Sequence, residues 1–222
     1  MKRLLLLSQI KTIKYGYLYN FYAISDARGI ANTGWHVPTV SEYQTLRNFI
    51  DPGSSDSTNT AGGPLKETGL TYWDSPNTGA TNSTKFNARG SGLRTAAGSF
   101  DSSKQRLMLR YTTDFVCEIR YDVDVFYTGN RSVGGGNTKA GISLRLIKDT
   151  TSLSDGQSGS YIGTDGKIYR TICIGTQEIT ADPIAETRYS NGDIIPTVTD
   201  GTTWAGLITG AKCAYDNNES NV

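Results

Sequence analysis

Regular alternation marks the segment from Phe115 to Tyr127. Every odd position in it is Phe, Cys, Ile, Tyr or Val. A period of two predicts a β-strand with one packed face and one face presented to solvent. The run is longer than an average strand, so we expect a bend or hairpin near Tyr121 to Asp124. The even positions, which this pattern turns outward, are Val116, Glu118, Arg120, Asp122, Asp124 and Phe126.

The presented face has two readings. One is an ordinary solvated strand face with charge pairs across neighbouring strands. The other is a surface that holds a partner, since carboxylates, a guanidinium and an aromatic ring share a small area. The same alternation turns Arg120 and Phe126 outward and packs Tyr127 inward.

Helical periodicity is clearest after Thr39. Thr39 and Glu42 have the spacing of a capping box, in which each side chain bonds a free backbone N–H of the first turn. The apolar positions that follow at helical spacing are Val40, Tyr43, Leu46 and Ile50, and Pro52-Gly53 ends the helix.

A second helix is predicted from about Asp200 to Ile208, with Gly210 as its stop. Its apolar face would carry Trp204, Leu207 and Ile208. The rest of the chain is typical of strands and long loops. Residues 51–63 are rich in Ser, Thr, Asn and Gly and predict a mobile loop, and residues 149–159 are the best linker candidate.

Length and composition limit the classes of function that the protein can have. The 222 residues suit one large or two small domains and can bury a core. The 22 basic and 21 acidic residues form no block of either sign, which argues against nucleic-acid binding and against a basic membrane patch. The 25 Gly and 13 Tyr residues suit a loop-rich protein that presents aromatic and amide side chains to a partner. Alternatively, Gly and Asn serve only the turns.

The first residues do not have the form of a signal peptide. Their apolar run, Leu4 to Leu7, is shorter than the usual 7–15 residues, and no small-residue cleavage site follows. We interpret this segment as a first β-strand. No stretch approaches the roughly 20 apolar residues of a membrane span, so membrane insertion is not expected.

Cysteine and histidine usage predicts neither a metal site nor a catalytic centre. Cys117, Cys173 and Cys213 cannot all pair within one chain, and no CxxC spacing occurs. We expect buried free thiols. His36, the single histidine, precedes a helix cap without a Ser or Cys nucleophile motif, which favours a structural role. We therefore expect no cofactor and no enzyme activity.

Two segments resemble signatures of one family. They are Gly34-Trp-His-Val-Pro-Thr39 and Gly141-Ile-Ser-Leu-Arg-Leu-Ile-Lys-Asp149. The family is the Fibrobacter succinogenes major paralogous domain, which has a C-type-lectin-like fold. Further similar segments lie at residues 15–22, 86–92 and 165–175. The resemblance implies an α+β fold with a twisted, mostly antiparallel sheet, two helices and long loops.

The segments stand in an unusual order. Those at residues 165–175 and 210–217 precede the Tyr15 to Tyr22 type of segment in the family but follow it here. This resembles a rotated domain in which residues 218–222 lead back towards Tyr15, as neighbouring surface termini would allow. We divide the chain into a main part, residues 1–149, and a segment, residues 150–222, that completes the same fold.

The resemblance also implies a recognition surface. Similar domains occur in gut phage and prophage proteins that retroelements diversify to change the ligand bound. There the stretch before the Gly141 to Arg145 type of strand is variable, which corresponds to residues 111–137. The ligand-binding residues expected from it are Tyr111, Asp114, Glu118, Arg120, Asp122, Asp124, Phe126, Tyr127 and Asn130.

We therefore expect a non-catalytic phage or prophage adhesin that binds a host cell-surface protein or glycan, and a homo-oligomer is compatible with this reading. The lectin calcium triplet is absent, so binding should need no metal. The expected location is a virion or cell surface, after synthesis in the cytoplasm without a recognisable signal peptide. The alternative is a structural fibre or decoration component without receptor specificity. A third reading is a secreted bacterial surface protein whose export signal is missing from this sequence.

Overall fold

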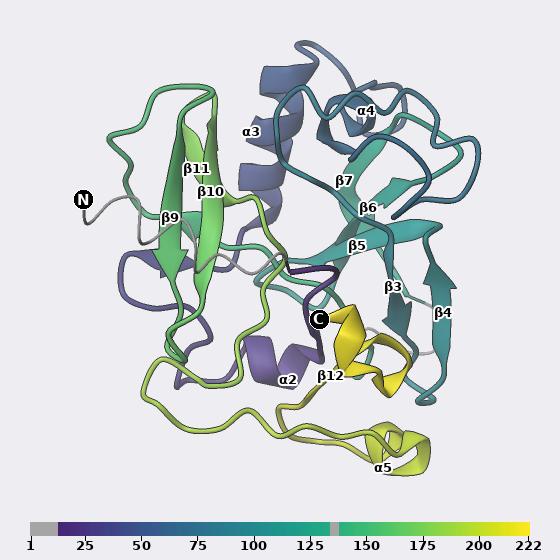
Figure 1. Ribbon diagram of the computed structural model, residues 1–222, viewed down its shortest axis with the longest axis vertical. Helices are drawn as coiled ribbons and strands as arrows, with labels where there is room; N and C mark the ends of the chain where they lie inside the picture. Colours follow the sequence, from purple (N-terminus) through teal and green to yellow (C-terminus); the bar gives the residue numbers. More distant parts are fainter. Residues whose placement is uncertain (1–12, 134–137) are drawn as a thin grey trace.

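The computed structural model describes residues 13–133 and 138–222 (Figure 1). Within these ranges the chain forms three sheets, most of whose strand pairs are antiparallel, and few helices. This confirms the predicted α+β class and the mostly antiparallel pairing. The strand predicted for the first residues lies outside the described part of the chain.

Two small elements join the ends of the described chain. Strand β1 (Leu18–Tyr19) pairs antiparallel with β12 (Lys212–Cys213). Short helices follow at both places, α2 (Phe21–Ile24) after β1 and the 3₁₀ turns η1 (Tyr215–Asn217) and η2 (Glu219–Asn221) after β12. The N–H of Tyr15 donates to the carbonyl of Asn221, so the last residues lie beside the start of the described chain.

One five-stranded sheet mixes strands from both sides of residue 149. Its order is β2 (Trp35–His36), β8 (Ile147–Lys148), β11 (Gln177–Thr180), β10 (Ile168–Ile174) and β9 (Ser158–Ile162). All its pairs are antiparallel. Strands that follow residue 149 therefore hydrogen-bond directly to strands that precede it.

The other five-stranded sheet carries the segment singled out by its alternation. Its order is β4 (Phe100–Ser103), β3 (Ser91–Arg94), β5 (Arg106–Arg110), β6 (Val116–Arg120) and β7 (Phe126–Arg131). Strands β3 and β5 run parallel, and the other pairs are antiparallel. The bend predicted near Tyr121 to Asp124 is confirmed as the turn between β6 and β7.

The longest helix lies between the two large sheets (Figure 1). This helix, α3 (Val40–Ile50), begins with the predicted capping box: Thr39 accepts from the N–H of Glu42, and Glu42 accepts from the N–H of Thr39 at 2.7 Å. Its Tyr43 and Leu46 are buried with apolar residues of both sheets. The main core therefore lies where the apolar side chains of α3 pack against both sheets, because an amphipathic helix must bury its apolar side.

The second predicted helix is shorter than expected. Helix α5 (Gly201–Ala205) begins at the cap Asp200 but ends at Gly206, not near Gly210. Glycine is a poor helix former, and its N–H closes the last turn. Trp204 is buried as predicted, whereas Ile208 is 77% exposed, so its assignment to the buried face is wrong. Two further helices of four residues, α2 and α4 (Gly62–Leu65), were not predicted.

The expected linker at residues 149–159 is held against the sheet that contains β9. Thr151 donates to the carboxylate of Glu178 at 2.6 Å, and the N–H of Gly156 donates to the carbonyl of Cys173. Cys173 in turn contacts the carbonyl of Leu153. All three cysteines are buried, as predicted, and their thiols are free.

Candidate functional site

The register of strands β5 to β7 decides which side chains share a face. Glu118 lies opposite both Met108 of β5 and Tyr127 of β7, and Arg120 lies opposite Arg106. Directly paired residues point to the same side of a sheet. Arg131 lies opposite Val116, beyond a bulge, and joins the same side. We call the group Arg106, Glu118, Arg120, Tyr127 and Arg131 the arginine face.

The same register overturns one expectation from the sequence. Ile119 lies opposite Phe126, so odd positions of β6 meet even positions of β7. The apolar face therefore changes parity across the turn. Phe126 is fully buried, and Tyr127 points outward, which is the reverse of our prediction. Val116, expected outward, is also fully buried.

Glu118 is the buried centre of the arginine face. Its side chain is 1% exposed, although the pattern placed it in solvent. The Nε of Arg106 lies 2.5 Å from one carboxylate oxygen, and the Nε of Arg131 lies 3.6 Å from the other. The first oxygen accepts no aligned hydrogen bond within the described residues. Two partly exposed arginines thus hold this carboxylate by charge, which keeps their guanidinium groups over it.

The rest of the face adds a second ion pair and a stacked ring. Arg120 donates to Asp122 through Nε at 3.0 Å and Nη2 at 2.6 Å. Partial burial acts to raise the pKa of Asp122, but the bonds from Arg120 outweigh it and the pKa lies below its ordinary value. The guanidinium of Arg131 lies 4.4 Å from the ring centroid of Tyr127. The face therefore presents three guanidinium groups and one phenol.

Other predicted ligand-binding residues lie elsewhere. Tyr111 is fully buried, and its hydroxyl donates to the carbonyl of Thr128 at 2.5 Å. This residue supports the sheet from the core side, so its predicted presentation to a ligand is wrong. Asp114 and Asp124 are half-buried beyond the strands, and Asn130 is exposed on β7. Arg106 and Arg131 were missed, although the alternation of Arg106, Met108 and Arg110 with buried leucines could have signalled Arg106.

A buried lysine fixes the turn that joins β6 to β7. The Nζ of Lys66 donates to the carbonyls of Thr78, Arg120 and Val123 at 2.6, 3.0 and 2.8 Å. Burial lowers the pKa of Lys66 to about 8, while the charges of Asp124 and Asp122 oppose this effect. No local pattern signals this contact, because the three carbonyls belong to two separate segments.

The comparisons identify the domain. The family model of the Fibrobacter succinogenes major domain matches residues 5–148. The chain belongs to this family. The match ends with the last residue of β8, so the similar segments at residues 165–175 and 210–217 lie outside it. No curated protein and no solved structure matches the chain.

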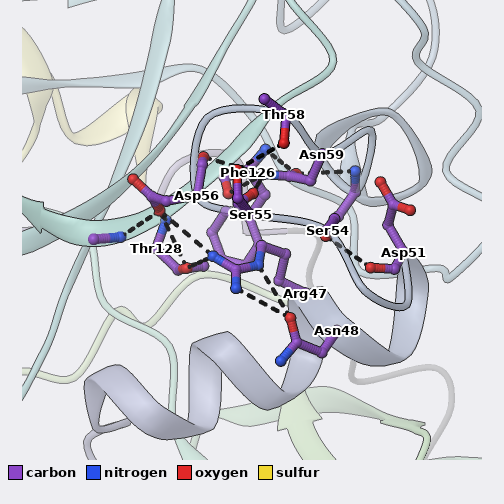
Figure 2. Close-up of polar contacts among 12 residues, drawn as sticks. Arg47, Asn48, Asp51, Ser54, Ser55, Asp56, Thr58, Asn59, Phe126 and Thr128 are labelled. Atoms are coloured by element: carbon purple, nitrogen blue, oxygen red, sulfur yellow. Dashed lines mark hydrogen bonds and ion pairs between the residues drawn. The ribbon is translucent and has the colours of Figure 1, made fainter.

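In this Fibrobacter succinogenes major domain, the segment expected to be a mobile loop is tied to the outer edge of β7 (Figure 2). Asn59 accepts from the N–H of Phe126 at 2.9 Å and donates to its carbonyl at 3.1 Å. Asp56 accepts from the N–H groups of Thr128 and Gly129, both at 2.5 Å, and lies 3.6 Å from Arg47. Side chains thus take the place of a further strand, which protects an edge from pairing with other chains.

The single histidine joins two segments of the same domain. His36 lies 2.7 Å from Glu42 through Nε2 and 2.6 Å from Asp149 through Nδ1. Burial acts to lower the pKa of His36, but the bonds to Asp149 and Glu42 outweigh it and raise the pKa. Glu42 also caps α3, so this histidine connects the cap to the end of β8.

The described residues hold neither a candidate membrane span nor a candidate metal cluster. No helix there is long and apolar enough to cross a membrane. No group of three or more His, Cys, Asp or Glu side chains in those ranges is arranged to hold a metal ion.

Proposed function

We propose that this family member is a non-catalytic recognition module with a C-type-lectin-like fold, in the role of a phage or prophage adhesin. The observation that carries the proposal is the arginine face. It gathers arginine and tyrosine, the side chains in which interfaces concentrate binding energy, on one side of strands β5 to β7. Residues 111–137, which would vary in retroelement-diversified relatives, contribute four of its five members.

The support beneath the face suits recognition. Its strands are backed by the main core, and its turn is fixed by Lys66. A face whose side chains are already held loses less conformational entropy on binding. Tyr127 and Arg131 stack on one another, which orders two long side chains before a ligand arrives.

The test is a binding screen of the labelled protein against a glycan array and intact bacterial cells. Replacement of Arg120 or Tyr127 with alanine should weaken binding by about 1–3 kcal/mol each, because both side chains are presented. Arg188→Ala is the control, since Arg188 is exposed in the segment between β11 and α5. A parent protein that binds nothing in the screen, or Arg120→Ala and Tyr127→Ala variants that both bind like the control, contradicts the proposal.

A second candidate function is a structural component of a virion or bacterial surface. The observation that favours it is the open edge of β9. Gln157 and Gly163 hydrogen-bond towards β10, as do the alternate residues Gly159 and Tyr161 between them. The backbone groups of Ser158 and Ser160 therefore point away from the sheet. They have no partner in the described part of the chain, in contrast to the protected edge of β7.

An open edge can pair with a strand of another copy and so build an assembly. Ser160→Pro tests this candidate, because it blocks edge pairing without removing a bond to β10. If sedimentation shows an oligomer of the parent protein that Ser160→Pro abolishes, assembly through β9 is supported. A parent protein that stays monomeric contradicts it.

A further inference from the structure

Among the described residues, the guanidinium groups of Arg106 and Arg131 are held at one edge and free at the other. Both approach Glu118 through Nε, and each side chain is partly exposed, 36% for Arg106 and 41% for Arg131. No contact with a described residue engages their Nη atoms, apart from the ring of Tyr127 below Arg131. Each arginine therefore presents unused N–H donors to solvent.

The charges of the arginine face do not cancel. Arg106, Arg120 and Arg131 carry three positive charges, and the acids in contact with them are Glu118 and Asp122. Glu118 is 1% exposed and lies beneath the two arginines that it binds. Its charge holds the guanidinium groups in place but is hidden from a ligand above them. Arg120 donates through Nε and Nη2 to Asp122, so it has the fewest N–H donors left for a ligand among the three arginines.

Planar N–H donors of this kind match the oxygens of a carboxylate, phosphate or sulfate group, which they bind in pairs. A neutral sugar hydroxyl would use the same donors less well, because it carries no charge to balance the excess on the face. The aromatic ring of Tyr127 offers an apolar contact beside the donors, which suits the body of a sugar ring.

We propose that the arginine face binds an oxyanion on a surface polymer, with Arg106 and Arg131 as the two anion-binding residues and Glu118 as the residue that positions them. This inference rests on the proposed recognition function and names the chemistry of its ligand. It also assigns binding roles to two residues that sequence alternation did not place at the site.

The experiment measures binding of the full chain to four immobilised polymers: polygalacturonate for carboxylate, polyphosphate for phosphate, heparin for sulfate, and dextran as the neutral control. The parent protein should bind at least one anionic polymer and not dextran. Binding should weaken about tenfold or more between roughly 50 and 500 mM salt, because partly exposed charge pairs are screened. The polymer bound identifies the source of the oxyanion.

Two variants assign the residues. Arg106→Gln/Arg131→Gln should weaken anion binding tenfold or more, whereas Lys85→Gln/Arg188→Gln removes the same charge from exposed positions outside the sheets and should bind like the parent. If the first variant does not fold because Glu118 is left unpaired, the triple variant that adds Glu118→Gln removes the buried charge and is measured instead.

The outcomes separate this inference from the proposed function. A parent that binds cells or neutral glycans but none of the anionic polymers overturns the inference and leaves the recognition function standing. The inference is also overturned if the arginine variants bind as tightly as the lysine and arginine control. A parent that binds nothing in either experiment overturns both.

Discussion

Replacement of Asn59 with alanine should remove the protection of the β7 edge. Its side-chain amide makes two ladder-like bonds to the backbone of Phe126, and both Asn59 and Phe126 are buried, at 2% and 0% exposure (Figure 2). Alanine leaves that N–H and that C=O without partners. A buried backbone group left unsatisfied costs about 1–3 kcal/mol, so the loss of two partners in Asn59→Ala should lower the free energy of unfolding by about 2–6 kcal/mol.

Urea unfolding followed by circular dichroism measures this loss. Asn130→Ala is the matched control, because Asn130 lies exposed on the same strand and its replacement should change stability by less than about 0.5 kcal/mol. The freed edge should also make Asn59→Ala self-associate at high concentration, which light scattering detects. An Asn59→Ala protein as stable as Asn130→Ala would refute the argument that side chains close this edge.

Three further predictions concern stability. Burial, followed by the charge of Asp165, raises the pKa of Glu186 to about 7, so folding favours its protonated form. This contribution to the free energy of unfolding is complete below the ordinary carboxyl pKa and is lost as pH rises through about 7. Between about pH 4 and 8 the free energy of unfolding of the parent should fall by about 3 kcal/mol relative to that of Glu186→Gln. Equal pH profiles of the two proteins would contradict this. Lys66→Met should lower the free energy of unfolding, measured in urea at about pH 7, by roughly 2 kcal/mol, because three carbonyls lose their donor. Removal of the buried charge offsets part of this loss. A variant as stable as the parent, or more stable, would mean that the offset dominates. Deletion of residues 149–222 removes β12, the partner of β1, and β11, one of the two partners of β8, so the remainder should show no cooperative melt. A sharp transition at the parent temperature would instead indicate two independent domains.

Local signals in the sequence were sufficient to predict several helices and strands. The capping box and apolar spacing of α3 act within one or two turns, so the helix was predictable from Thr39 to Ile50. Alternation identified the strands around the turn at Tyr121 for the same reason. The signature segments at residues 34–39 and 141–149 indicate the family without any contact between distant residues, and the match over residues 5–148 confirms it.

The composition of the candidate site could be predicted only in part. Glu118, Arg120 and Tyr127 share a face, but Phe126 and Tyr111 belong to the core. The error at Phe126 arose at the turn between β6 and β7: its length pairs odd with even positions, and a shift of one residue moves every later side chain to the other face. Alternation within a strand does not contain the register between strands.

Tertiary structure alone decided the contacts that support the site. The amide of Asn59 replaces a strand beside Phe126, and the ammonium of Lys66 binds carbonyls from two other segments. These partners are distant in sequence. The residues that surround Asn59 and Lys66 along the chain would look the same whether the side chain bonded another segment or faced water. The sequence by itself determined the elements and the family, because those depend on neighbours along the chain. The face that meets a ligand depends on register and on long-range hydrogen bonds, which exist only in the folded protein.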